Sequence, residues 1–219
     1  MTARLGRPPE SERPDRIRDI TDAAIEIFGR DGYAPATFSG IARAAGITPA
    51  ALYRYFDDKA ALYVHAARAA RGRIWDCISE RFDQSGDLVA DFTSLIGVIG
   101  ALPDEMSAGL RLLAALQVTA VHHPELTMSI DERFAVRDRV VGDLGRRAHR
   151  SGQLAGFDSE DDAALAIELV FSGLAVERYA YPHLQEALDR VAIRNVLALT
   201  RDVGSGGDRS CSGPPLRST

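Results

Sequence analysis

The sequence predicts an all-α protein with an N-terminal three-helix helix-turn-helix domain, a C-terminal helical domain and about nine helices. Apolar residues recur at spacings of three and four along most of the chain, which is the period of an amphipathic helix. Almost no segment alternates apolar and polar residues between turn dipeptides, the pattern typical of strands. The chain has 219 residues, 46% of them hydrophobic and 26% charged, so it is long enough to bury a substantial core.

Helix start and stop signals place the elements in order. A first helix begins near Pro14, where proline suits the first turn, and stops before Asp31-Gly32. A second, short helix follows Thr37 and closes at Gly46, and a third runs from Thr48 to Phe56. A long fourth helix covers residues 57–86. The remaining predicted helices span residues 88–101, 105–121, 124–151, 160–179 and 184–203.

These elements divide the chain into four parts. Residues 1–12 are predicted to be a mobile basic arm, 13–60 the helix-turn-helix domain, 61–203 the second helical domain and 204–219 a disordered tail of Gly, Ser, Pro and Arg. Residues 1–73 hold 12 Arg or Lys against 9 Asp or Glu, whereas residues 74–219 hold 14 against 22, within a net charge of −5. This asymmetry suggests that the front of the chain meets a polyanion, although chance can produce it too.

Composition and motifs exclude several classes of protein. Cys77 and Cys211 are too few for a disulfide framework or a zinc cluster, which fits a reducing cytoplasm. We find neither the apolar core of a signal peptide nor the roughly 18 apolar residues of a membrane span, so no membrane partner is expected. His122 and His123 are adjacent and point about 100° apart on a helix. They therefore do not form a metal site together. Since the sequence also contains no motif typical of a catalytic site, it predicts no enzyme, no metal and no cofactor.

The predicted third helix has a face suited to a DNA groove. On a regular helix Leu52 and Phe56 point inward, because they are four residues apart. The outward side then carries small and basic residues flanked by two phenols: Ala50, Ala51, Arg54, Tyr53 and Tyr55. Alanine permits close approach to bases, arginine can reach a guanine edge, and tyrosine hydroxyls can meet phosphates. Ala42 and Gly46 fit the crossing and the turn between two steeply packed helices.

The stretch from Thr37 to Leu62 resembles the DNA-binding domain of the TetR family of bacterial repressors. The residues that carry the resemblance are Thr37, Ile41-Ala42, Ala45-Gly46-Ile47-Thr48, Leu52-Tyr53-Arg54-Tyr55-Phe56, Lys59 and Leu62. The resemblance covers about residues 15–63. It implies a nine-helix, Ω-shaped homodimer, with a divergent C-terminal domain that binds a small effector and dimerises through its last two helices. It further implies a repressor released from a palindromic, double-stranded DNA operator by a small, largely apolar effector.

Matching positions carry the DNA contacts over to this chain. The residues expected at DNA are Thr37, Ser39, Thr48, Pro49, Ala50, Ala51, Tyr53, Arg54, Tyr55 and Lys59. The tyrosines and Lys59, the only lysine of the chain, would hold phosphates, and Arg54 would face bases. The sequence departs from the common pattern at Phe38-Ser39-Gly40 and at Ala50, so the operator sequence does not follow from it.

The C-terminal domain supplies candidates for an effector site and a dimer interface. The candidate ligand residues are Trp75, Phe82, Phe92, Met106, Leu110, Gln117, Val121 and Phe134, many of which can equally be ordinary core. The helix after Ser159 has two apolar stripes, one of Ala163, Ile167, Val170 and Leu174 and another of Leu165, Leu169 and Val176. The first stripe, with Leu188 and Val191 of the last helix, is the predicted dimer interface.

Two other interpretations stay open. A central helix of a monomer would also be apolar on two sides, so the stripes alone do not require a dimer. An all-helical small-molecule-binding or interaction protein that does not touch DNA is the alternative function, and it leaves an outward Tyr53, Arg54 and Tyr55 without a purpose.

Overall fold

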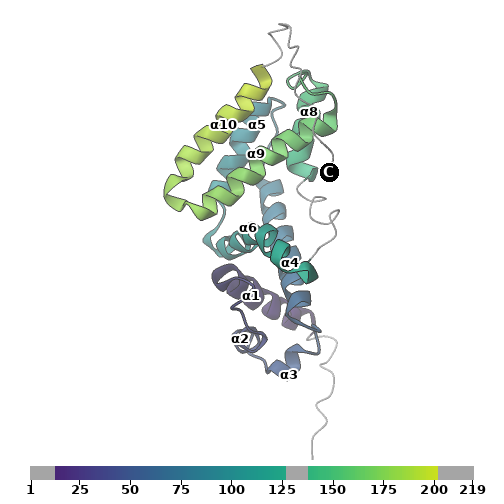
Figure 1. Cartoon of the computed structure of the whole chain (residues 1–219), viewed down its shortest axis with the longest axis vertical. Coiled ribbons are helices and arrows are strands. Elements are labelled where there is room, and N and C mark those ends of the chain that lie inside the picture. The colour runs from purple at the N-terminus through teal and green to yellow at the C-terminus, as the bar shows by residue number, and fades with distance from the viewer. Residues whose placement is uncertain (1–12, 127–137, 202–219) are drawn as a thin grey trace, which may run out of the picture.

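The structure, a computed structural model, describes residues 13–126 and 138–201, and within these residues every regular element is helical (Figure 1). The all-α prediction is therefore confirmed. The predicted arm at residues 1–12 and the predicted tail at 204–219 lie outside the described residues. The molecule is elongated, with α1–α3 at one end and α8–α10 at the other (Figure 1).

Short helical turns separate the main helices. The elements are α1 (Arg13–Asp31), α2 (Phe38–Ala44), α3 (Pro49–Leu52), α4 (Lys59–Arg81), α5 (Leu88–Gly100), η2 (Asp104–Met106), α6 (Ser107–His122), η3 (Pro124–Leu126), the π-helical η4 (Asp138–Gly142), α8 (Asp143–Arg150), α9 (Glu160–Ala180), η5 (Pro182–Leu184) and α10 (Gln185–Arg201).

Most helices begin at a residue whose side chain caps the first turn. The capping side-chain oxygen accepts a hydrogen bond from the backbone N–H three residues later, and such caps each stabilise a helix by about 1 kcal/mol. The capping residues are Thr37 for α2, Thr48 for α3, Asp58 for α4, Asp87 for α5 and Ser159 for α9. These caps fix where each of the five helices starts, which is why their predicted starts lie close to the observed ones.

Two predicted helix lengths are wrong, and a third predicted helix differs from the structure in its described part. The helix α3 ends at Leu52, because the next residues turn more tightly, with Arg54 N–H donating to the Ala51 carbonyl at 3.1 Å. The fourth helix stops at Arg81 rather than near Gly86, where the chain turns around the buried Asp91 carboxylate. The predicted helix over residues 124–151 begins instead as the 3-10 turn η3, and its described end consists of the π-helical η4 continuing directly into α8, while residues 127–137 lie outside the described part of the chain.

Two clusters of buried residues form the core. The first lies among α1, α2, α3, the first half of α4 and α6, and includes Phe28, Leu52 and Tyr63. The second lies among the second half of α4 and α5, α8, α9 and α10. The helix α4 contributes to both clusters and Leu113 of α6 packs against both, so α4 and α6 connect them.

The helices α1 and α6 pack at backbone contact. A Cβ atom built on Gly29 of α1 would lie 2.1 Å from the Ala108 carbonyl oxygen of α6, a distance that no side chain can occupy. Arg111 of α6 also donates from Nε to the Gly29 carbonyl at 3.1 Å. The absence of a side chain at Gly29 is thus what permits this close approach.

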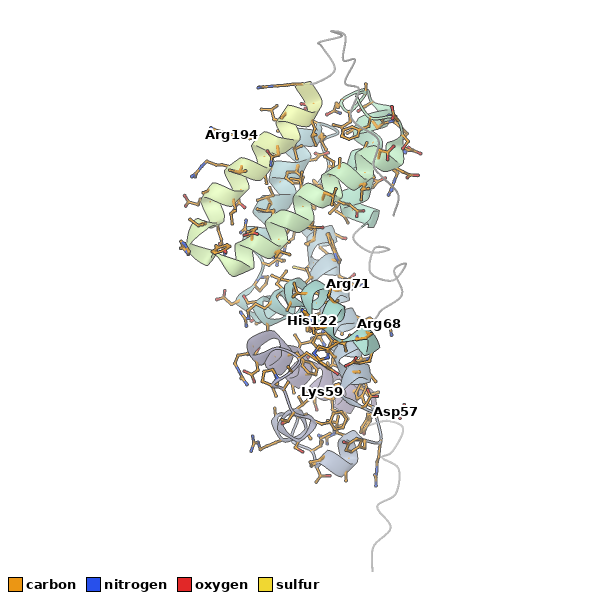
Figure 2. All side chains as sticks on the ribbon, in the orientation of Figure 1. Asp57, Lys59, Arg68, Arg71, His122 and Arg194 are labelled. Carbon is orange, nitrogen blue, oxygen red and sulfur yellow. The ribbon has the colours of Figure 1, made fainter. Side chains whose placement is uncertain are left out.

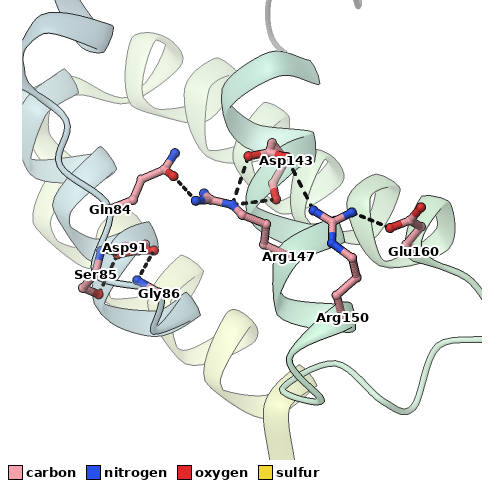
Figure 3. A network of polar contacts seen from close by, with 8 residues as sticks. All are labelled: Gln84, Ser85, Gly86, Asp91, Asp143, Arg147, Arg150 and Glu160. Atoms are coloured by element: carbon pink, nitrogen blue, oxygen red, sulfur yellow. Dashed lines mark hydrogen bonds and ion pairs between the residues drawn. The ribbon is translucent and has the colours of Figure 1, made fainter.

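Polar contacts join the α4–α5 loop to α8, and α8 to the start of α9 (Figure 3). The buried Asp91 carboxylate accepts from Ser85 N–H at 2.6 Å and from Gly86 N–H at 3.1 Å. Nearby, Arg147 bonds to Gln84 and to Asp143, and Arg150 binds Glu160 at 2.6 Å, in the set of contacts drawn in Figure 3. These contacts fix the positions of the α4–α5 loop, α8 and the start of α9 relative to one another.

Candidate DNA interface and ligand cavity

The helices α2 and α3 form a compact tip at one end of the molecule (Figure 1). Gly46 lies between them with φ +67°, a conformation that favours glycine, and Ile47 N–H donates to the Ala42 carbonyl at 2.9 Å to close α2. Ala42 is fully buried, as expected for the residue at a close helix crossing. This turn fixes the angle at which α3 leaves the domain.

The surface of the tip carries most of the residues predicted to touch DNA. Thr37, Ser39, Thr48, Pro49, Ala50, Tyr53 and Arg54 are exposed, and Ala51 is half-buried. Tyr53 is 58% exposed, and its ring lies 4.5 Å from the ring of Phe38 between centroids. Phe38, one of the positions that depart from the usual pattern, therefore supports the tyrosine that faces solvent.

Tyr55 differs from its predicted position. It is half-buried and packs against the first core cluster instead of standing on the outer flank of a helix. The reason is the early end of α3: beyond Leu52 the angular step of an α-helix no longer applies. The two tyrosines are thus unequal, and only Tyr53 is exposed as expected.

Lys59 serves a purpose other than the predicted phosphate contact. Its Nζ donates to the backbone carbonyls of Tyr33 at 2.9 Å, Ala36 at 3.1 Å and Ala34 at 3.3 Å. It also lies 4.3 Å from the centre of the Tyr33 ring. Because an ammonium has three N–H groups, these carbonyls use all of them, and Lys59 clamps the loop between α1 and α2.

We expect Lys59→Met to lower the free energy of unfolding by about 2–4 kcal/mol, since hydrogen bonds to a charged group contribute about 1.5–3 kcal/mol each and some carbonyls will recover water. Urea denaturation measures this loss. Lys59 also allows the two roles to be separated, because removing a phosphate contact reduces the salt slope of DNA binding by about one. If Lys59→Met lowers the salt dependence of DNA binding by about one and leaves the free energy of unfolding unchanged, the predicted phosphate contact is correct and the clamp is not.

Aromatic residues connect the tip to the end of α6. Tyr33, in the clamped loop, contacts the Tyr63 ring at 5.0 Å and the His123 ring at 4.8 Å between centroids. Burial raises the pKa of Tyr33, and the charges of Glu125 and Asp58 raise it further. The phenol therefore stays neutral across the physiological range, and the joint depends on packing rather than on ionised tyrosine.

A cavity of about 510 Å³ lies among α4, α5, α6 and α9. Its walls are mostly apolar, with Trp75, Ile78, Ile99 and Phe171 among the larger side chains. Volume and lining are within the range of small-molecule sites, which run from about 300 to 1,000 Å³.

The structure places two of the predicted ligand residues, Trp75 and Leu110, in the wall of this cavity. Phe82 and Phe92 are buried in the second core cluster, Met106 packs against that cluster, and Val121 is 77% exposed; none of these four lines the cavity. Apolar composition alone could not separate wall from core. The Gln117 side chain and all of Phe134 lie outside what the structure describes.

Sequence reasoning missed the charged residues of the wall. Arg71 and Glu168 are buried and line the cavity, as does Arg178, whose Nη1 lies 2.5 Å from Asp189 Oδ1 of α10. A signal existed, because Glu168 interrupts the apolar run of α9 and a charge is rarely buried without a partner. The cavity thus combines apolar walls with a few ionic groups.

The predicted dimer stripe on α9 faces the wrong way. Ala163, Ile167 and Leu174 are buried in the second core cluster of the same chain, and Val170 and Leu188 pack against it. The other stripe is the outward one, with Leu165 53% and Leu169 65% exposed, and Val191 of α10 is exposed too. Two apolar stripes on one helix do not indicate by themselves which of them meets the chain's own core.

Among the described residues, we find no group of three or more His, Cys, Asp or Glu side chains that could hold a metal ion. Over the same part of the chain, no helix is both long enough and apolar enough to span a membrane.

Comparison with known proteins finds similar sequences for the N-terminal part of the chain and similar structures for the fold. The family model described as "Bacterial regulatory proteins, tetR family" matches residues 20–66. The HTH-type transcriptional regulator BetI of Rhizobium meliloti is 35% identical over 69 residues, 32% of this chain and 34% of the relative. BetI of Klebsiella pneumoniae is 28% identical over 122 residues, 54% of this chain and 62% of the relative. The chain spans about a third to three fifths of the length of these curated relatives.

Solved structures cover more of the chain. A TetR family transcription regulator from Marinobacter aquaeolei superposes with a TM-score of 0.64 at 17% identity, over 86% of this chain and 97% of that one. The regulator FadR from Bacillus subtilis, solved in complex with stearoyl-CoA, gives a TM-score of 0.55 at 19% identity, over 85% and 99% of the two chains. At these identities the likeness concerns the fold.

Proposed function

The chain belongs to the tetR family of bacterial regulatory proteins, and from that premise we propose that it is a transcription regulator that binds operator DNA through the tip formed by α2 and α3. The observation that carries the proposal is the surface of α3: an exposed Ala50 beside an exposed Tyr53 and Arg54, with the supporting Leu52 fully buried. Small residues allow approach to base edges, and the phenol and guanidinium can contact phosphate or guanine.

The regulator acts in the cytoplasm as a homodimer on a palindromic operator. A two-fold axis presents two tips to DNA, so that each tip reads one half-site. The Tyr53 hydroxyl and the helix starts at Thr37 and Thr48 position the tip on the backbone, while Arg54 and Ala50 face bases.

The effector is a small, largely apolar molecule that occupies the cavity among α4, α5, α6 and α9 and releases the repressor from DNA. In support, the cavity has the size of a ligand site, and FadR, a protein of similar fold, was solved with stearoyl-CoA. The buried Arg71 and Glu168 and the half-buried Arg178 suit a ligand that also carries a polar group.

The test is operator binding by Tyr53→Ala. With a labelled duplex taken from upstream of the protein's own gene, fluorescence anisotropy at fixed salt should show at least about a tenfold loss of affinity, because a hydrogen bond to a charged group contributes about 1.5–3 kcal/mol. Tyr53→Phe keeps the contact with Phe38 and isolates the hydroxyl. An unchanged affinity for Tyr53→Ala, with an unchanged melting temperature, would refute the proposed interface.

A further inference from the structure

The charged and hydroxyl-bearing side chains of the cavity wall are not equivalent. Those that the structure describes belong to Arg71, near the middle of the molecule (Figure 2), and to Glu168, Ser172 and Arg178. The first three already interact with other groups of the protein. The guanidinium of Arg178 makes one hydrogen bond within the described residues, from Nη1 to the Asp189 carboxylate at 2.5 Å. Of these groups, Arg178 is therefore the one with donors left for a ligand.

The remaining donors of Arg178 are largely shielded from bulk water. A guanidinium carries five N–H groups and no acceptor, and the Arg178 side chain is 11% exposed. Its Nη2 reaches the end of α5, where a Cβ built on Gly100 would lie 3.2 Å away. The lack of a side chain at Gly100 thus leaves space beside this nitrogen. A ligand group placed here must be a hydrogen-bond acceptor.

Among acceptors, a carboxylate fits Arg178 best. Hydrogen bonds between a guanidinium and a carboxylate are shorter and about twice as strong as those between neutral groups, and the planar fork can hold both oxygens. Asp189 binds at Nη1 and does not line the cavity, so it leaves Nη2 and Nε to a ligand. Asp189 is also 25% exposed, and the nearby water weakens its repulsion of a second carboxylate.

The shape of the cavity selects an elongated molecule. On α9 its lining residues run from Leu165 to Arg178, a distance of about 20 Å at 1.5 Å per residue. A volume of about 510 Å³ spread over that length makes a narrow channel. The larger wall side chains are apolar, among them Trp75 and Phe171. Because Arg178 is the last lining residue on α9, the acceptor group belongs at one end of an apolar chain.

We propose that the cavity takes an elongated amphipathic carboxylate, with its head group held by Arg178 and its hydrocarbon part lying along Trp75 and Phe171. The inference rests on the proposed function, which gives the cavity to a largely apolar effector. It goes beyond that function because it assigns the effector a charge and names the residue that recognises it. A neutral or cationic molecule of the same length leaves the donors of Arg178 unpaired and binds more weakly.

The test compares probes that share a hydrocarbon chain and differ in their head group. Decanoate, decanol and decyltrimethylammonium are titrated into the full-length chain, below their solubility and micelle limits. Trp75 is the single tryptophan of the chain and lines the cavity, so its fluorescence reports binding at this site rather than at the tip. Decanoate should bind at least about tenfold more tightly than either of the other two probes.

Two substitutions separate the ligand contact from the ion pair. Arg178→Gln removes the guanidinium, whereas Asp189→Asn breaks the same ion pair and leaves the guanidinium in the wall. Arg178→Gln should lower the affinity for decanoate at least about tenfold and leave that for decanol unchanged. Asp189→Asn should bind decanoate at least as tightly as the parent. If Arg178→Gln does not fold, Arg178→Lys retains the charge but lacks the planar fork, and should reduce the preference for decanoate over decanol.

Several outcomes overturn the inference: a parent chain that binds none of the probes or does not prefer decanoate, or an Arg178→Gln chain that keeps the preference. Equal losses in Arg178→Gln and Asp189→Asn overturn it too, because the ion pair would then support the cavity rather than the ligand. The proposed function fails separately. Decanoate that binds as expected but leaves operator affinity unchanged contradicts an effector role for the cavity and leaves the inference standing, while Tyr53→Ala still decides whether the tip binds DNA.

Discussion

Ala50→Glu should abolish specific operator binding, with a loss of affinity of at least about a hundredfold. Ala50 is exposed at the second position of α3, where the proposed interface brings the helix against DNA. A carboxylate there faces phosphates and base-edge acceptors, and like charges brought together at an interface cost several kcal/mol. Fluorescence anisotropy at fixed salt, with the same duplex as for Tyr53→Ala, measures the loss.

The fold should tolerate Ala50→Glu, which makes it a clean variant. An acidic residue in the first turn of a helix interacts favourably with the helix dipole. Ala90→Glu is the matched control: Ala90 is exposed in the first turn of α5, in the other half of the molecule, and should bind the operator like the parent. If Ala50→Glu binds as tightly as Ala90→Glu, α3 does not contact the groove.

Gly29→Ala should cost about 3 kcal/mol or more in the free energy of unfolding, because the added methyl meets backbone and cannot be relieved by a side-chain rotation. The new Cβ would lie 2.1 Å from the Ala108 carbonyl oxygen, so α1 and α6 must separate. The Arg111 contact to the Gly29 carbonyl, at 3.1 Å, would lengthen with them. Urea denaturation followed by circular dichroism gives the change.

Gly97→Ala provides the comparison for Gly29→Ala. Gly97 also lies within a helix, but it is exposed and an added Cβ has nothing within 4 Å. Alanine should stabilise that site by up to about 1 kcal/mol, through helix propensity alone. Equal effects at the two glycines would mean that α1 and α6 can shift apart at little cost.

The helix starts of the tip could be predicted from sequence, whereas the end of α3 could not. Thr37 and Thr48 cap α2 and α3 through contacts three residues along the chain, and local contacts of this kind are visible in a sequence. The early end of α3 depends on where the chain must go next, which is a property of the tertiary structure. The position of Tyr55 was wrong for that reason, and the position of Tyr53 was correct.

The role of Lys59 and the orientation of α9 depend on contacts distant in sequence. The carbonyls that bind Lys59 lie 23 to 26 residues away, so nothing near the lysine indicates them. On α9 the periodicity correctly predicted two apolar stripes, but the choice between them is made by α5, α8 and α10. Periodicity shows that a face is buried and leaves open what buries it.

The single lysine of the chain has a chemical consequence. The Lys59 Nζ donates hydrogen bonds to three carbonyls, and acylation requires this nitrogen to be free to attack the acyl donor. The side chain of Lys59 can therefore react only when the α1–α2 loop has opened and released it. The extent of acylation at Lys59 therefore reports how often the α1–α2 loop opens, which makes this residue a chemical probe of local unfolding beside the tip.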